Sequence, residues 1–157
     1  MKRGLFASAL VGVLLLLGFA TPAGAGGNST LPASALSAAS GPCGGSYSHI
    51  GHYRINSSAG TLAYLDVYWS GRANRNCLVT NHSGRTYGVS LYTQATIRPS
   101  GWNWPSCPNS TGCDGGHYSY YAGPVYTPAG VNMTNRCIDV KGVIDWTGRT
   151  LTRIHCG

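Results

Sequence analysis

Six cysteines, all placed after a leader-like N-terminus, constrain the fold of this 157-residue chain more than any other feature. They are Cys43, Cys77, Cys107, Cys113, Cys137 and Cys156. An even number of cysteines in a small exported domain is typical of a disulfide framework. We therefore expect all six to be paired and expect the bridges to brace one small domain.

The N-terminus predicts export. Residues 1–3 are Met-Lys-Arg, an apolar run follows over 5–20, and residues 23–25 read Ala-Gly-Ala. These are the basic region, the apolar region and the cleavage site of a secretory signal. The apolar run is too short for a membrane anchor. We predict a signal peptide over 1–25 and a secreted, extracellular mature protein with no membrane attachment.

Six cysteines allow fifteen pairings. Because only Pro-Asn-Ser-Thr-Gly separates Cys107 from Cys113, we predict a local bridge between them. For the other four, the pairings between near neighbours in sequence are favoured, and the main alternative joins the two ends of the domain. The favoured pairings are Cys43–Cys77 with Cys137–Cys156, and the alternative is Cys43–Cys156. No C-x₂-C spacing is present, so we expect no zinc site built on cysteine.

Residues 26–42 form a segment of linker composition ahead of the cysteine-rich domain at 43–157. The segment is uncharged and consists mostly of glycine, alanine and serine, which predicts a flexible arm. Leu31 and Leu36 are candidate docking residues if the arm adds a strand to the sheet edge of a partner. The alternative is a leader with no binding role.

Strand patterns dominate the domain, and no segment shows a sustained helical period. Short segments in which apolar and polar residues alternate, separated by turn residues, predict an all-β fold. We expect a small disulfide-bonded β-sandwich or barrel of about seven antiparallel strands, with a long structured loop over 98–116 and a bend at Gly123-Pro124. The expected strands span 47–55, 61–70, 76–81, 87–97, 117–126, 137–144 and 151–156.

The mature domain carries all ten tyrosines and all four tryptophans, whereas both phenylalanines lie in the leader. These amphipathic rings suit a thin β core, and they are also enriched at binding surfaces. Trp102 and Trp104 lie on the predicted bridged loop, where they could stack on sugar rings, anchor a protein interface or cap the β body. With Tyr120 and Tyr121 they are the candidate binding residues of the domain.

The sequence contains few residues suited to catalysis or to metal binding. The chain has no glutamate and four aspartates, of which Asp66 and Asp139 lie in predicted strands and are the candidates for a carboxylate pair. No nucleophile motif accompanies the histidines. Three residues separate His49 from His52, and on a regular strand this spacing places the two rings on opposite faces. We therefore expect no enzyme activity, no cofactor and no metal site.

The charge pattern also limits the partners. The chain has a formal net charge of +7, but its basic residues are scattered and form no lysine- or arginine-rich run. Modest positive charge suits anionic polymers such as cell-wall glycans. Because the basic residues are not clustered in the sequence, we expect no nucleic-acid partner.

Five segments carry a family resemblance: 64–68 (YLDVY), 76–80 (NCLVT), 120–126 (YYAGPVY), 137–140 (CIDV) and 155–157 (HCG). In these segments the chain resembles small secreted actinomycete proteins of the spore-associated protein A type. More weakly, it resembles the small adaptor subunits of streptomycete umbrella toxin particles. The resemblance covers 43–157 and departs from the pattern over 98–116, where Cys107 and Cys113 look like an added pair. It implies an extracellular, non-enzymatic β protein and supplies no catalytic residues.

We expect from these observations a secreted binding or adaptor protein of an extracellular assembly, such as an antibacterial toxin particle or a spore-surface complex. Its partners would be other secreted proteins of that assembly. The alternative is a lectin-like binder of cell-wall polysaccharide or exopolysaccharide that uses Trp102 and Trp104. A third hypothesis is a small secreted hydrolase or toxin that uses Asp66 or Asp139 with a histidine.

Overall fold

The computed structural model describes residues 41–108 and 110–157, and this part of the chain is all-β. Its strands are β1 (Ser48–Ser57), β2 (Gly60–Ser70), β3 (Arg75–His82), β4 (Leu91–Pro99), β5 (Cys113–Tyr118), β6 (Tyr121–Tyr126), β7 (Ile138–Ile144) and β8 (Thr147–Ile154). The predicted all-β class is confirmed. The predicted arm over 26–42 lies almost wholly outside the described residues, and so do Leu31 and Leu36.

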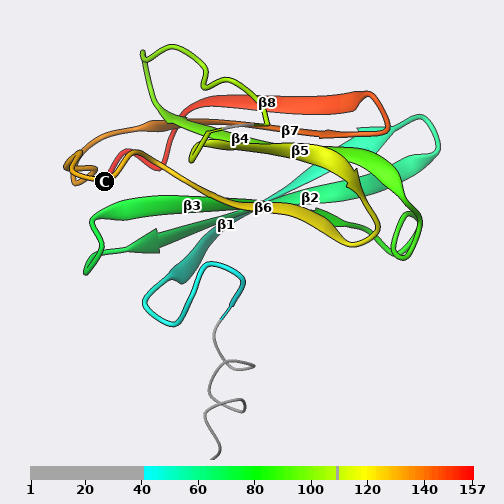
Figure 1. The fold of residues 1–157 in the computed structure, drawn as a ribbon, viewed down its shortest axis with the longest axis horizontal. Helices are drawn as coiled ribbons and strands as arrows, with labels where there is room; N and C mark the ends of the chain where they lie inside the picture. The colour runs from blue at the N-terminus through cyan, green and yellow to red at the C-terminus, as the bar shows by residue number, and fades with distance from the viewer. Residues whose placement is uncertain (1–40, 109) are drawn as a thin grey trace, which may run out of the picture. The chain divides into compact units, whose positions relative to one another are not determined.

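The strands form two antiparallel four-stranded sheets that lie face to face as two layers (Figure 1). The first sheet has the order β1-β2-β3-β6 and the second has the order β5-β4-β7-β8. The two sheets are separate, with no hydrogen-bonded closure between them in the described chain, so the fold is a sandwich and not a barrel.

The core lies between the sheets and follows from the period-two alternation of their strands. In β2, Ala63, Leu65 and Val67 are fully buried, and in β7 Ile138 and Val140 are fully buried against them in the same cluster. Each large apolar side chain buried in this way contributes about 1.5–3 kcal/mol relative to exposure. The alternation thereby determines which side chains are left for the outer faces.

Three disulfides brace the sandwich, and all three match the favoured pairing: Cys43–Cys77, Cys107–Cys113 and Cys137–Cys156. The alternative Cys43–Cys156 pairing is wrong. The Cys43–Cys77 bridge lies with Val79 in a second, smaller cluster, against which Tyr47, Tyr68 and Tyr126 pack. Since Cys77 and Val79 point away from the main core, this bridge fastens the segment before β1 over the outer face of the first sheet.

Strand boundaries differ from the prediction where the chain changes sheets. The single strand expected over 117–126 is two strands, because the chain crosses at Ser119 and Tyr120 from β5 in the second sheet to β6 in the first. β4 begins at Leu91 and not at position 87, so Val89 lies exposed in a turn. β5 extends back to Cys113, which shortens the predicted loop.

Two changes of chain direction have clear backbone causes. The bend expected at Gly123-Pro124 is confirmed: Gly123 has a φ of 98°, and the β3–β6 pairing shifts register opposite it, between Leu78 and Thr80. The hairpin between β7 and β8 turns through Asp145 and Trp146, both with positive φ, as a two-residue turn of this kind requires. No described helix has the length and apolar character needed to cross a membrane.

Candidate functional site

The outer face of the first sheet carries polar and aromatic side chains at its centre. Because Leu65 and Val67 face the core, their neighbours Tyr64, Asp66 and Tyr68 point outward from β2. Strand register places Asp66 beside His52 of β1 and Tyr64 beside Asn81 of β3. The alternation of β2 therefore puts one acid between histidine and amide donors.

A bulge in β1 brings the two histidines to this same face. His49 pairs with Tyr68 and Gly51 pairs with Val67, so Ile50 is an extra residue in the β1–β2 ladder. The extra residue shifts the alternation by one position. The expectation that His49 and His52 point to opposite faces is therefore wrong, because it assumed a regular strand.

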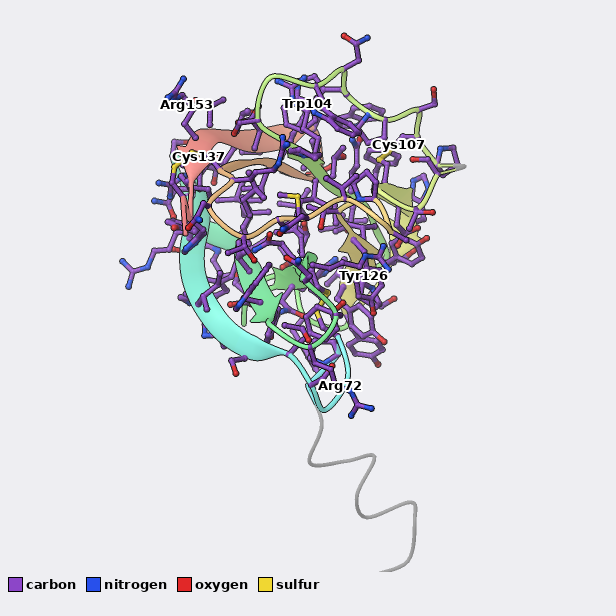
Figure 2. The ribbon with its side chains drawn as sticks, turned by 90° about the vertical axis from the view of Figure 1, so that its left-hand side faces the viewer. Arg72, Trp104, Cys107, Tyr126, Cys137 and Arg153 are labelled. Carbon is purple, nitrogen blue, oxygen red and sulfur yellow. A yellow bond between two sulfur atoms is a disulfide. The ribbon has the colours of Figure 1, made fainter. Side chains whose placement is uncertain are left out.

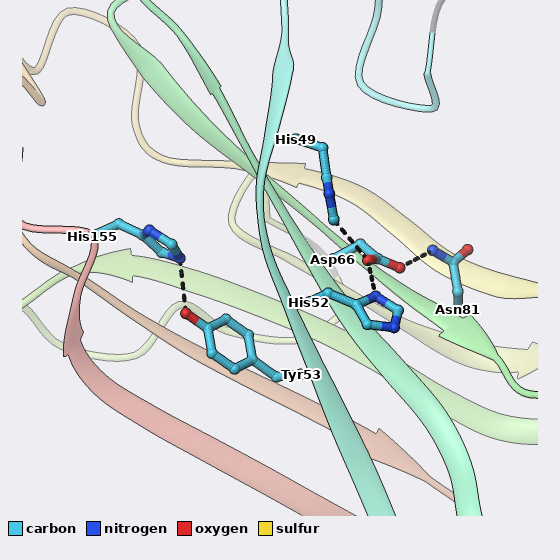
Figure 3. A network of polar contacts seen from close by, with 6 residues as sticks. All are labelled: His49, His52, Tyr53, Asp66, Asn81 and His155. Carbon is cyan, nitrogen blue, oxygen red and sulfur yellow. Dashed lines mark hydrogen bonds and ion pairs between the residues drawn. The ribbon is translucent and has the colours of Figure 1, made fainter.

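The histidines converge on one carboxylate oxygen (Figure 3). His49 Nε2 lies 2.9 Å and His52 Nδ1 lies 2.6 Å from Asp66 Oδ1. Asn81 donates its Nδ2–H to the other oxygen, Oδ2, at 2.7 Å. We call His49, His52 and Asp66 the histidine–aspartate cluster; its three ligand atoms lie within 4.8 Å of one another.

Burial differs sharply within this cluster. The side chain of Asp66 is 11% exposed, whereas those of His49 and His52 are 46% and 51% exposed. The ring of His52 stacks on Tyr64 at 4.3 Å between centroids, and the ring of His49 lies 5.0 Å from Tyr68. The cluster is thus a fixed acid covered by two solvent-facing imidazoles, which is a donor set suited to a metal ion.

Asp139 has a different environment on the second sheet. It lies in β7, is 3% exposed, and accepts hydrogen bonds from Arg98 Nε, Ser100 Oγ and the Arg153 N–H at 2.9, 2.5 and 2.9 Å. Burial raises the pKa of Asp139, but these hydrogen bonds together with the Arg98 charge outweigh burial and lower it. Since Asp66 projects from the outer face of the first sheet and Asp139 lies in the second, the two candidate aspartates do not form the carboxylate pair that a glycosidase would need.

A second polar contact joins the edges of the two sheets. Tyr53 Oη and His155 Nε2 are hydrogen-bonded at 3.0 Å, as Figure 3 shows. His155 also lines a hollow of about 350 Å³ together with Ile50, Trp69 and Met133. Burial lowers the pKa of His155, which favours the neutral imidazole.

The predicted binding residues Tyr120 and Tyr121 lie where the chain crosses between the sheets. Both are about half exposed, and the ring of Tyr120 packs 4.9 Å from that of Tyr87, which is 66% exposed. We call Tyr87, Tyr120 and Tyr121 the tyrosine cluster. Backbone bonds hold it in place, from His82 N to Tyr120 O and from Gly88 N to Ser119 O, each 2.8 Å.

Two hollows flank the tyrosine cluster. One, of about 530 Å³, is lined by the three tyrosines with Asn81 and His82. The other, of about 420 Å³, is lined by Tyr120 and Tyr121 with Asp114 and Tyr118. Sequence reasoning missed Tyr87 because it assigned position 87 to a strand, and only the tertiary contact with Tyr120 places it beside the predicted binding residues.

Trp102 and Trp104 lie on the loop after β4, which the Cys107–Cys113 bridge closes. Figure 2 labels Trp104 and Cys107 on this loop. Trp102 is exposed and lines a hollow of about 340 Å³ with Pro105, Tyr126 and Pro128. The guanidinium of Arg98 covers Trp104 at 3.9 Å from the ring centroid. Arg98 also lines the Trp102 hollow and donates to the Trp102 carbonyl oxygen, so one arginine contacts both tryptophans.

Another exposed indole was not among the binding residues predicted from the sequence. Trp146, in the β7–β8 turn, is 80% exposed and stacks on Tyr92 with ring centroids 5.0 Å apart. Trp146 lies in a turn that was not predicted from the sequence, because the last strand was expected to begin at position 151.

Comparison with known proteins identifies no relative: no family model matches the chain, and neither a curated protein nor a solved structure matches it significantly.

Proposed function

We propose that this protein is a secreted, non-enzymatic binding protein that acts as an adaptor in an extracellular protein assembly. The observation that carries the proposal is the tyrosine cluster, which is exposed and flanked by two hollows on a disulfide-braced scaffold. Three disulfides suit an oxidising compartment. They support the secretion that the leader over 1–25 predicts.

Tyrosine supports protein binding for physical reasons. A tyrosine ring buries a large apolar area, offers one hydroxyl group and loses few rotamers when it is fixed. Tyr120 and Tyr121 already have backbone positions set by the crossing between sheets, so little further order is needed on binding. The adjacent Asp114 and Asn81 supply hydrogen-bonding groups at the rims of the hollows.

The predicted arm over 26–42 supplies the second contact in this proposal. An uncharged segment with small side chains gains affinity mainly through backbone pairing with an exposed sheet edge. The main hydrophobic cluster and all three bridges are formed by residues between Cys43 and Cys156. An adaptor of this design would dock its arm on one partner and present the tyrosine cluster to another.

The Trp102 hollow favours a second candidate function, a lectin-like binder of cell-wall or extracellular polysaccharide. An exposed indole beside a hollow of about 340 Å³ offers an apolar face on which a sugar ring can stack. The nearby Asn103 supplies a polar group at the same hollow.

Affinity purification from culture medium tests the adaptor proposal. The full secreted chain is compared with a Tyr120→Ala/Tyr121→Ala variant, with a variant lacking 26–40, and with Trp146→Ala as a control for an exposed aromatic outside the cluster. We expect exported proteins to co-purify with the wild type and the control, and each test variant to lose at least one of them.

A glycan array screened with the same four proteins and with Trp102→Ala separates the second candidate. Binding to a glycan that is lost in Trp102→Ala, with no co-purifying protein, would favour the lectin over the adaptor. Undiminished co-purification by both test variants would contradict the adaptor proposal.

A further inference from the structure

We propose that the histidine–aspartate cluster is a binding site for a divalent first-row transition-metal ion of the Zn²⁺ type. The ligand atoms are His49 Nε2, His52 Nδ1 and Asp66 Oδ1. This site lies on the outer face of the first sheet and uses none of the three residues of the tyrosine cluster, although Asn81, which hydrogen-bonds to Asp66, also lines one of the hollows beside that cluster.

The spacing of the three ligand atoms fits an ion after a small opening. Ligand atoms bound at about 2.0–2.1 Å from one ion lie about 3.0–3.4 Å apart. The two nitrogen–oxygen distances are 2.9 and 2.6 Å. The two nitrogens lie within 4.8 Å of each other. Rotation of the solvent-facing imidazoles about their side-chain torsions would have to lengthen both nitrogen–oxygen distances and bring the two nitrogens to the same spacing.

Asn81 gives the acid the second partner that metal-bound carboxylates commonly have. It donates to Asp66 Oδ2, which orients the carboxylate and leaves Oδ1 directed at both imidazoles. In the described chain no arginine or lysine forms an ion pair with Asp66. Its negative charge, largely removed from water, is therefore available to a cation held by the two rings.

The donor set selects the class of metal. Two imidazole nitrogens with one carboxylate oxygen suit Zn²⁺, Cu²⁺ or Ni²⁺, whereas Ca²⁺ and Mg²⁺ require oxygen ligands in larger number. Three protein ligands leave at least one coordination position open. The exposure of both imidazoles places that position toward solvent, where water or a donor atom of a partner would complete the shell.

The direct test is isothermal titration of ZnCl₂ into untagged, chelator-treated mature protein. We expect one ion per chain. The variant His49→Gln/His52→Gln keeps amide donors for Asp66 but removes both nitrogen ligands, so it should show no binding. His117→Gln, a change at an exposed histidine outside the cluster, should bind as the wild type does.

Two further measurements separate a metal site from a purely structural hydrogen-bond network. Asn81→Ala should keep the one-to-one stoichiometry and weaken Zn²⁺ affinity by about 10- to 100-fold. In NMR spectra, Zn²⁺ should shift the imidazole signals of His49 and His52 and leave those of His117 unchanged. Absence of Zn²⁺ binding by the wild type, or equal binding by the double histidine variant, would overturn the proposal.

Discussion

At the scale of single residues, two strand aspartates acquire different chemistry from their neighbours. Asp66 has two imidazoles and an amide as partners, and the two imidazoles that cover it face solvent. Asp139 is enclosed by an arginine, a serine and a backbone N–H. The first arrangement is covered by exposed side chains, as the proposed metal site requires, whereas the second is a closed structural contact.

Replacement of Asp139 by asparagine should destabilise the domain. The neutral amide would leave the Arg98 guanidinium, whose side chain is 18% exposed, without its counter-charge. Loss of one member of a buried pair costs about 3–5 kcal/mol. Urea unfolding at neutral pH measures this cost, and Asp145→Asn in an exposed turn should change stability by less than about 0.5 kcal/mol.

The pH dependence of the stability difference between the wild type and Asp139→Asn follows from the direction in which the pKa of Asp139 is shifted. The pKa of Asp139 is lower in the folded than in the unfolded chain, so the ionised carboxylate stabilises the fold above its ordinary pKa of 3.8. That stabilisation is lost as the pH falls through the folded pKa. A gap between wild type and Asp139→Asn that widened in acid would contradict this assignment.

His155 should titrate below its ordinary pKa of 6.5, since burial disfavours the imidazolium. Below pH 6.5 the unfolded chain takes up a proton that the folded chain resists, so acidification lowers the free energy of unfolding. NMR titration measures the pKa directly. Between about pH 7.5 and about pH 5.5, on either side of the ordinary histidine pKa, His155→Gln should lose less stability than the wild type, and an equal loss would count against the prediction.

Gly142 of β7 packs tightly against side chains of the first sheet. A Cβ at this position would press on Leu65 and would lie 2.9 Å from Thr80 Oγ1. Gly142→Ala should therefore cost about 1–3 kcal/mol through overpacking. Gly84 has open space around it, so thermal unfolding of Gly84→Ala should match the wild type. Equal melting temperatures for both variants would show that the layers can separate at no cost.

At the scale of elements, each disulfide restrains a different part of the sandwich. Cys43–Cys77 fastens the segment before β1, Cys107–Cys113 closes the loop after β4, and Cys137–Cys156 ties the start of β7 to the C-terminus. Their sequence separations are 34, 6 and 19 residues. These separations rank the bridges, because longer closed loops lose more entropy in the unfolded chain.

Paired cysteine-to-alanine changes that remove one bridge at a time should lower the free energy of unfolding in the order of this ranking. Loop-closure entropy predicts losses of about 4 kcal/mol for Cys43–Cys77, about 3 kcal/mol for Cys137–Cys156 and about 2 kcal/mol for Cys107–Cys113. Urea unfolding of the three variants measures the order. If loss of Cys107–Cys113 proved the most costly, the loop after β4 would have a larger structural role than its length indicates.

At the scale of the whole molecule, the fold class could be predicted from the sequence in good detail. The period-two pattern of residues 61–70 matches β2, and the pairing of all six cysteines follows from their proximity in sequence. The crossing at Ser119–Tyr120 could not be predicted in this way. Residues 117–126 have continuous strand character, and only the partner strands separate them into two sheets.

Export and oxidation should be visible in one intact-mass measurement. The protein recovered from culture medium should start near residue 26, and its mass should be lower by six hydrogens than that of the reduced mature chain, as three bridges require. Alkylation of the denatured, unreduced protein should label no cysteine. Two or more labelled thiols would contradict the disulfide framework.

What the sequence determined by itself was local: strand character, turn positions such as Gly123-Pro124, and the closure of short loops by nearby cysteines. These depend on backbone preferences and on entropy along the chain. The tertiary structure alone decided that His49 and His52 share a face, because the bulge at Ile50 exists only in the pairing of β1 with β2. Register between strands depends on the packing of both partners, and a single strand's alternation does not contain it.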